Sequence, residues 1–235
     1  MSGLGTMANV AAVVIGSLIG MVVKGGLKQR FQDILMQVLG LATMFIGASG
    51  ALKGIFVVEG SSLSTTNTMM LIISLVGGAI LGELLLIEDR LDHFGVWLKE
   101  KTKLKGDNRF VEGFVTSSLV ICVGAMAIVG SLQDGLHQDA SMLYAKSILD
   151  FIIVMIFASS LGIGVLFSAI PLGIYQGAIT LSATVIEPFL SDVRIANLSF
   201  VGSVLIFGVG VNIAFGKKFK VGNMLPAVLI PFFFG

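Results

Sequence analysis

Residues 141–190 read SMLYAKSILDFIIVMIFASSLGIGVLFSAIPLGIYQGAITLSATVIEPFL, and this stretch decides the fold class. It is apolar enough to lie in lipid, yet polar and helix-breaking residues recur along it: Lys146, Asp150, Ser159, Ser160, Gly162, Gly164, Pro171, Tyr175 and Gln176. Ionisable groups inside a membrane span are costly and mark functional sites. A helix break in lipid must face protein or a water-filled cavity. We therefore expect this stretch to line a polar cavity, as discontinuous helices do in many transporters.

The composition of the 235-residue chain indicates a membrane protein throughout. The chain is 55% hydrophobic and only 12% charged, whereas a soluble domain is about 25% charged. Several apolar runs exceed the roughly 18 residues that a membrane helix needs. We predict an all-α, polytopic integral membrane helix bundle that forms a single transmembrane domain over residues 1–235.

Seven spans follow from the hydropathy pattern, and an eighth apolar segment is shorter. The eighth, 222–235, is either a short span or a half-span. We expect the sixth to be broken near Pro171. The first run has no basic leader and no cleavage motif, so we interpret it as a retained span. The expected spans cover about 4–23, 32–52, 68–87, 110–132, 142–158, 162–187 and 196–215.

Residues 88–105 differ from the spans around them. Leu91, Phe94 and Leu98 fall on one helical face and charged residues on the others, while Trp97 adds an aromatic anchor. This pattern predicts an amphipathic helix at the membrane surface that leads into a basic cytoplasmic loop.

Basic residues predict the orientation of the chain. They cluster at 24–30, 90–109 and 217–220, and loops rich in lysine and arginine lie in the cytoplasm. Eight spans satisfy all three clusters when the N-terminus and the C-terminus both lie outside. The linker 53–67 is expected to be an outer polar loop.

Small residues form two ridges. Ala8, Ala12, Gly16 and Gly20 recur every four residues in the first span, and Ser74, Gly78 and Gly82 do so in the third. Such ridges let helices approach closely. The two ridges pack on each other, or one of them forms a homodimer, and the sequence leaves both readings open.

An internal repeat is also predicted. Residues 117–123, SSLVICV, align without gaps with 159–165, SSLGIGV, and the match continues to Gly135 and Gly177. A weaker relation between spans 1–3 and 6–8 would be inverted, as in secondary transporters.

The candidate solute or ion site gathers polar residues from several spans. Lys146 and Asp150 are four residues apart, so they share a helix face; a structural ion pair and a binding site are equally good interpretations. For Asn9, capping of a neighbour competes with a site role, and for Glu83 an interfacial pair with a lysine does. The full candidate set is Asp150, Lys146, Ser117, Ser118, Ser159, Ser160, Tyr175, Gln176, Asn9 and Glu83.

Other classes of function find little support. The net charge of +1 gives no reason to expect a nucleic-acid partner, and Cys122 alone excludes an intrachain disulfide. Asp134, His137 and Asp139 have spacing for a weak metal site, but a short exposed loop is the better interpretation. No motif with a catalytic mechanism occurs, so we expect no enzyme, no cofactor and no metal.

Several stretches together resemble a known family: LGELLLIEDRLDHFG, GFVTSSLVICVGAMAIVGSLQDGL, KSILDFIIVMIFASSLGIGVLFSAIP, YQGAITL and VGNMLPA. The chain resembles the uncharacterised bacterial inner-membrane proteins of the YqgA/YdfK type, which share domain of unknown function 554. The resemblance spans nearly the whole chain and implies a multi-span fold in the bacterial cytoplasmic membrane. It implies no substrate and no functional residues.

Two hypotheses of function follow. The first is a small secondary transporter or channel that moves an ion or a small polar solute through a cavity built by spans 4–6, with a protonatable Asp150 coupling transport to protons. The second is a non-transporting membrane scaffold or regulatory subunit that acts through helix–helix contacts.

Overall fold

The computed structural model describes residues 2–24, 28–102, 109–122, 125–189 and 191–234. Its chain divides into two compact units, and the boundaries fall within two helices. Unit 1 is Met1–Met36 with Leu91–Phe189, and unit 2 is Gln37–Arg90 with Leu190–Gly235.

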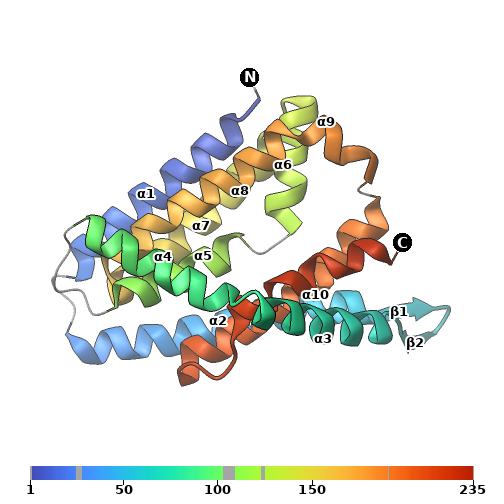
Figure 1. Ribbon diagram of the computed structural model, residues 1–235, viewed down its shortest axis with the longest axis horizontal. Coiled ribbons are helices and arrows are strands. Elements are labelled where there is room, and N and C mark those ends of the chain that lie inside the picture. The colour runs from blue at the N-terminus through green and yellow to red at the C-terminus, as the bar shows by residue number, and fades with distance from the viewer. Residues whose placement is uncertain (1, 25–27, 103–108, 123–124, 190, 235) are drawn as a thin grey trace. The chain divides into compact units, whose positions relative to one another are not determined.

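The described elements are almost all helical, which confirms the all-α prediction (Figure 1). The long helices are α1 (Leu4–Lys24), α2 (Gln29–Ile55), α3 (Thr68–Leu84), α4 (Ile87–Lys101), α7 (Ser141–Leu161) and α10 (Asp192–Phe215). Shorter ones are α5 (Phe110–Cys122), α6 (Ala125–His137), α8 (Ala169–Leu181), α9 (Ala183–Ile186) and α11 (Val221–Met224). The 3₁₀ segments are η1 (Ile163–Ser168), η2 (Glu187–Phe189), η3 (Leu225–Val228) and η4 (Ile230–Phe233).

The candidate membrane spans match the expected spans in number. Among the described residues, five helical segments are long and apolar enough to cross a membrane, and two bent helix pairs raise the number to seven. The apolar segment Val221–Phe233 is shorter. It consists of three short segments, α11, η3 and η4.

In unit 1, α1 lies alongside α7 and α8, and α6 lies against α8 (Figure 1). Gly16 and Gly20 of α1 bring its backbone onto α7, because a Cβ on either would collide with the carbonyl of Phe151 or Met155. At the other side of the unit, Phe110 and Phe114 form a core with Leu98 of α4, and the Phe110 and Phe167 rings are 5.2 Å apart. The apolar face predicted for residues 88–105 therefore buries Leu98 at this core.

Gly162 separates α7 from the sixth span, in agreement with the expected spans 142–158 and 162–187. The helix α8 continues through Pro171, so the prediction of a break near Pro171 is wrong. Gly162 has φ 85°, a left-handed conformation that favours glycine, and it ends α7. The six 3₁₀ residues of η1 follow, and α8 then begins at Ala169. Pro171 lies in the first turn of α8, where a missing N–H breaks no helix hydrogen bond.

In unit 2, α2 and α10 run antiparallel in close contact. A Cβ on Gly40 would lie 2.6 Å from the backbone of Ala214, and one on Gly50 would meet Ser203. The core contains Met70, Phe200, Val201 and Ala227. Between α2 and α3, the linker predicted to be a polar loop contains an antiparallel hairpin, β1 (Phe56–Glu59) with β2 (Ser62–Thr65), which projects from the end of α2 (Figure 1).

Each of the two small-residue ridges packs within its own unit. The α1 ridge contacts α7 within unit 1. The α3 ridge in unit 2 contacts the C-terminal segment, since a Cβ on Gly78 or Gly82 would collide with the backbone of Ala227 or Asn223. Each ridge is therefore covered within its own unit, and these contacts support neither ridge-to-ridge packing nor a homodimer formed through a ridge.

Candidate functional site

A buried polar cluster lies in unit 1 where α1, α7 and α8 meet. It consists of Asn9 of α1, Lys146 and Asp150 of α7, and Gln176 of α8, and none of them is more than 6% exposed. Apolar side chains occupy the next helical turn on the same faces: Val13, Val154 and Leu172 are fully buried. The cluster is therefore a polar island inside an apolar interior.

Asn9 links the two other helices through its side-chain amide. Its Nδ2 donates to Asp150 Oδ2 at 2.9 Å and to Gln176 Oε1 at 3.3 Å. Asp150 and Gln176, which the sequence analysis assigned to one cavity, thus meet through a third residue of the same candidate set.

Lys146 forms an ion pair with Asp150, as their spacing on one helix face predicts. Its Nζ also donates to the carbonyl oxygen of Ile121 at 2.8 Å. Ile121 lies in the last turn of α5, where helix carbonyls have no partner within the helix and carry the negative end of the helix dipole. The ammonium therefore joins a helix end to the cluster.

Two atoms of the cluster have no hydrogen-bond partner among the described residues. They are Asn9 Oδ1, an acceptor, and Gln176 Nε2, a donor. Elsewhere in unit 1, Ser17 on α1 and Ser131 on α6 also have buried hydroxyls without a partner among the described residues. A buried polar group without a partner costs about 1–3 kcal/mol, so the cluster has an unmet capacity to hydrogen-bond to a polar guest or to water.

The polar contacts continue toward the N-terminal end of α1. Thr6 and Thr180 hydroxyl oxygens are 3.3 Å apart, and the Gly5 N–H donates to Asp134 Oδ2 at 3.0 Å. Asp134 is fully buried in α6 and its other oxygen has no partner among the described residues. The expectation that Asp134 lies in an exposed loop is wrong, because α6 continues to His137 and turns this carboxylate toward the start of α1.

The predicted serine and tyrosine residues do not join the cluster through any hydrogen bond to it among the described residues. Ser117, Ser118 and Ser159 donate to carbonyls of their own helices, at 2.5 Å to Gly113, 2.6 Å to Phe114 and 2.7 Å to Ile156. Ser160 is buried with an unpartnered hydroxyl. Tyr175 is half-buried on α8. In an apolar helix, a serine hydroxyl donates to a backbone carbonyl three or four residues earlier when no other acceptor is within reach.

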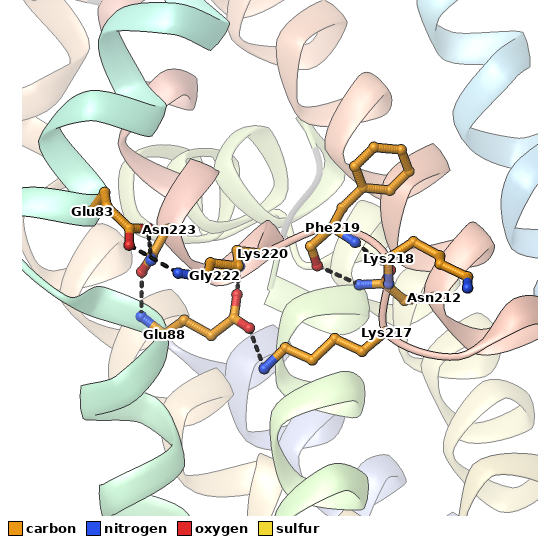
Figure 2. Close-up of polar contacts among 9 residues, drawn as sticks. All are labelled: Glu83, Glu88, Asn212, Lys217, Lys218, Phe219, Lys220, Gly222 and Asn223. Atoms are coloured by element: carbon orange, nitrogen blue, oxygen red, sulfur yellow. Dashed lines mark hydrogen bonds and ion pairs between the residues drawn. The ribbon is translucent and has the colours of Figure 1, made fainter.

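Glu83 lies in unit 2, in a separate polar cluster (Figure 2). Its carboxylate accepts from Lys220 Nζ at 2.8 Å and from Asn223 Nδ2 at 2.6 Å. The hydrogen bond that Lys220 donates to Glu83 raises the pKa of this lysine above its usual value. Glu83 is thus paired with a lysine, the alternative that the sequence analysis weighed against a site role.

Glu88 and Asn223 complete this second cluster (Figure 2). Asn223 Oδ1 accepts from the Glu88 N–H at 2.7 Å, and Glu88 Oε2 accepts from the Gly222 N–H at 3.0 Å. Lys217 forms an ion pair with Glu88. These bonds fix the junction of α3 and α4, where Leu86 has φ 50°, a conformation that costs a side-chain-bearing residue about 1–2 kcal/mol.

Sequence reasoning missed Asp134, Glu88 and Asn223. A carboxylate in QDGL and one in LLLIEDR resemble ordinary loop and surface residues. Asp134 and Asn223 each adjoin a glycine in the sequence, which is a weak signal of a close backbone approach. Glu88 has no such signal, because its partners Gly222 and Asn223 lie 134 and 135 residues away.

Of the other residues considered for a metal, His137 ends α6 and Asp139 lies in the loop before α7. Asp139 is exposed, and the hydrogen bonds that it accepts from Ser141 lower the pKa of its carboxyl group. No group of three or more His, Cys, Asp or Glu side chains suited to a metal ion occurs among the described residues.

Comparisons with known proteins place the chain among membrane proteins. The family described as "Protein of unknown function (DUF554)" matches residues 4–235. The chain is 33% identical over 227 residues to the "Uncharacterized membrane protein YdfK" of Bacillus subtilis (strain 168), covering 97% of this chain and 93% of that protein. It is 31% identical over 231 residues to the "Uncharacterized protein YqgA" of Escherichia coli (strain K12), covering 97% and 94%. No solved structure matches it.

Proposed function

We propose, from the premise that this membrane protein belongs to the DUF554 family, that it is a small secondary transporter or channel for an ion or a small polar solute. The expected location is the bacterial inner membrane. The charged residues and helix breaks in the second half of the chain, together with Asn9, supply the polar groups that this activity requires.

The observation that carries the proposal is the unmet hydrogen bonding of the Asn9 cluster. Asn9 Oδ1 and Gln176 Nε2 lie beside a charged pair in the middle of apolar helices. Polar groups held in lipid at this expense are characteristic of solute and ion pathways. An acceptor and a donor on neighbouring helices suit a guest that both donates and accepts hydrogen bonds.

A helix end beside the cluster supports the same proposal. α5 ends one residue after Ile121, whose carbonyl oxygen accepts a hydrogen bond from Lys146. Discontinuous helices expose carbonyl and N–H groups at membrane depth, and transporters use such ends in their binding sites. Lys146 donates a hydrogen bond to one of these carbonyls, that of Ile121. If this hydrogen bond breaks, both the Lys146 ammonium and the Ile121 carbonyl become available to a guest.

A non-transporting scaffold or regulatory subunit is the second candidate. The observation that favours it is the internal pairing of Lys146 with Asp150, which neutralises both charges without any guest. A buried ion pair of this kind is weak evidence for function by itself.

Flux through the purified full chain in proteoliposomes tests the two candidates. Gradients of sodium, potassium, chloride and protons, and osmotic gradients of urea and glycerol, are the probes. We expect wild-type flux above that of protein-free liposomes for at least one probe, and a loss of at least about tenfold in Asp150→Asn, equivalent to about 1.4 kcal/mol.

Asp139→Asn is the matched control, because it removes an exposed carboxylate outside the cluster. It should keep the wild-type flux. Flux of Asp150→Asn that equals wild type at every pH would remove the coupling role of Asp150, and wild-type flux no higher than the liposome background for all probes would favour the scaffold.

A further inference from the structure

An apolar cavity of about 350 Å³ lies within unit 2, between α3, α10 and the segment 219–224. Leu75 and Val76 of α3 line one side and Leu205 and Gly208 of α10 line another, while Phe219 and Val221 close the end next to the basic loop. We refer to it as the α3/α10 groove. Its volume falls in the range of small-molecule sites.

The groove is open on one side and closed on the other. Leu205 and Val221 are buried and form its floor, whereas Val76 and Phe219 are exposed at its rim. Protein interiors are close-packed, so a void of this size forfeits many van der Waals contacts unless something fills it. An occupant must be almost purely apolar where it meets the floor.

The groove runs from the middle of two helices toward the loop 216–220. Both α3 and α10 lead to this loop, because Lys220 contacts Glu83 near the end of α3 and Gly216 follows the end of α10. An occupant would therefore have an apolar part at membrane depth and its other end at the level of the loop lysines.

Lys218 differs from the two other lysines of the loop. Lys217 is paired with Glu88 and Lys220 with Glu83, but the Lys218 ammonium has no partner among the described residues. The Asn212 side chain accepts from the Lys218 N–H at 2.8 Å and fixes the backbone there. Figure 2 shows the Lys218 side chain extending away from Glu83 and Glu88. It is an exposed cation next in the chain to Phe219, which lines the end of the groove.

We propose that the α3/α10 groove binds an anionic phospholipid, with one acyl chain against Leu205 and Gly208 and the phosphate at Lys218. The apolar lining matches a hydrocarbon chain, and the single unpaired lysine beside Phe219 matches a negative headgroup. Gly208 makes room for the chain, since a Cβ there would touch only Val221, at 3.4 Å.

Thermal unfolding of the delipidated full chain in detergent tests this proposal. Dioleoyl phosphatidylglycerol and dioleoyl phosphatidylcholine have the same chains and differ in headgroup charge. We expect phosphatidylglycerol to raise the Tm at lower concentration than phosphatidylcholine. Lys218→Glu should weaken phosphatidylglycerol binding at least about fivefold, the effect of one lysine near an anionic surface.

Three further variants separate the contribution of the acyl chain from that of the headgroup. Lys53→Glu makes the same charge change on an exposed lysine of α2 and should leave binding unchanged. Gly208→Leu fills the groove and should abolish stabilisation by both lipids, while Gly177→Leu, in α8, should not.

Equal binding of the two lipids overturns the proposal, and so does a Lys218→Glu effect no larger than that of Lys53→Glu. Wild-type lipid binding in a folded Gly208→Leu protein overturns the place of the acyl chain. If Gly208→Leu fails to fold, Lys218→Glu still tests the headgroup contact. The Lys218 side chain has no partner among the described residues, so this substitution should not impair folding.

Discussion

At the scale of single residues, the amide of Asn9 determines how the buried charges of unit 1 are shared. Its Nδ2 contacts Asp150 on α7 and Gln176 on α8, so one side chain orients groups from two other helices. The sequence analysis included all three in the candidate set. It did not predict the contact of Lys146 with Ile121, because that contact depends on where α5 ends.

The Lys146–Asp150 pair yields a prediction about stability. Lys146→Met leaves the Asp150 carboxylate buried without its cation, which should lower the free energy of unfolding by about 3–5 kcal/mol. The double variant Lys146→Met with Asp150→Leu removes both charges and should be far less destabilised. Denaturant unfolding of the detergent-solubilised protein measures the difference.

Lys53→Met serves as the control for this pair, since it removes an exposed lysine. It should change stability by less than about 0.5 kcal/mol. A double variant as unstable as Lys146→Met alone would contradict the interpretation, because the unpaired charge would then not be the cause. A stable double variant that has lost flux would assign the pair to the pathway rather than to the scaffold.

At the scale of elements, the helices were predictable and their ends were not. Runs of apolar residues set the spans, and all the expected ones contain helix. The break near Pro171 was predicted because proline is in general a strong helix breaker, yet a proline in the first turn of a helix fits there. The internal repeat stays a prediction; its aligned serines lie inside α5 and at the end of α7.

Glycines of similar appearance in the sequence have opposite roles in the helices. A Cβ on Gly82 would collide with the backbone of Asn223, whereas one on Gly177 would meet nothing within 4 Å. We expect Gly82→Ala to destabilise the protein by about 1–3 kcal/mol through overpacking. Gly177→Ala should stabilise it by up to about 1 kcal/mol, because alanine is the better helix former.

Unfolding midpoints of the two variants, measured side by side, check this pair. Equal effects would show that the C-terminal segment does not pack on the α3 ridge. A large cost for Gly177→Ala would indicate that another surface covers α8 at that position.

At the scale of the whole molecule, the basic clusters predict that residue 53 and residue 218 lie on opposite sides of the membrane. In a Cys122→Ala background, Lys53→Cys should react with a membrane-impermeant maleimide in intact cells. Lys218→Cys should react only after the membrane is opened. Both lysines are exposed, so packing does not limit the reaction.

The opposite labelling pattern would reverse the predicted orientation. Labelling of both cysteines in intact cells would contradict an odd number of crossings between the two positions. A homodimer also stays a prediction, and any such contact must use faces other than the ridges of α1 and α3, which are covered within their units.

The pairing of Lys146 and Asp150 on one helix has a consequence for how the chain enters the bilayer. Each charge alone would cost about 2.5–3.5 kcal/mol at the centre of an inserting helix. Because both residues belong to α7, they can pair before any other helix packs against it. The helix can therefore leave the translocon with no net charge on this pair. Asn9 is synthesised before α7, and its hydrogen bond to the Asp150 carboxylate forms only after α7 is in the membrane. Assembly of the polar cluster therefore follows insertion of α7 and does not drive it.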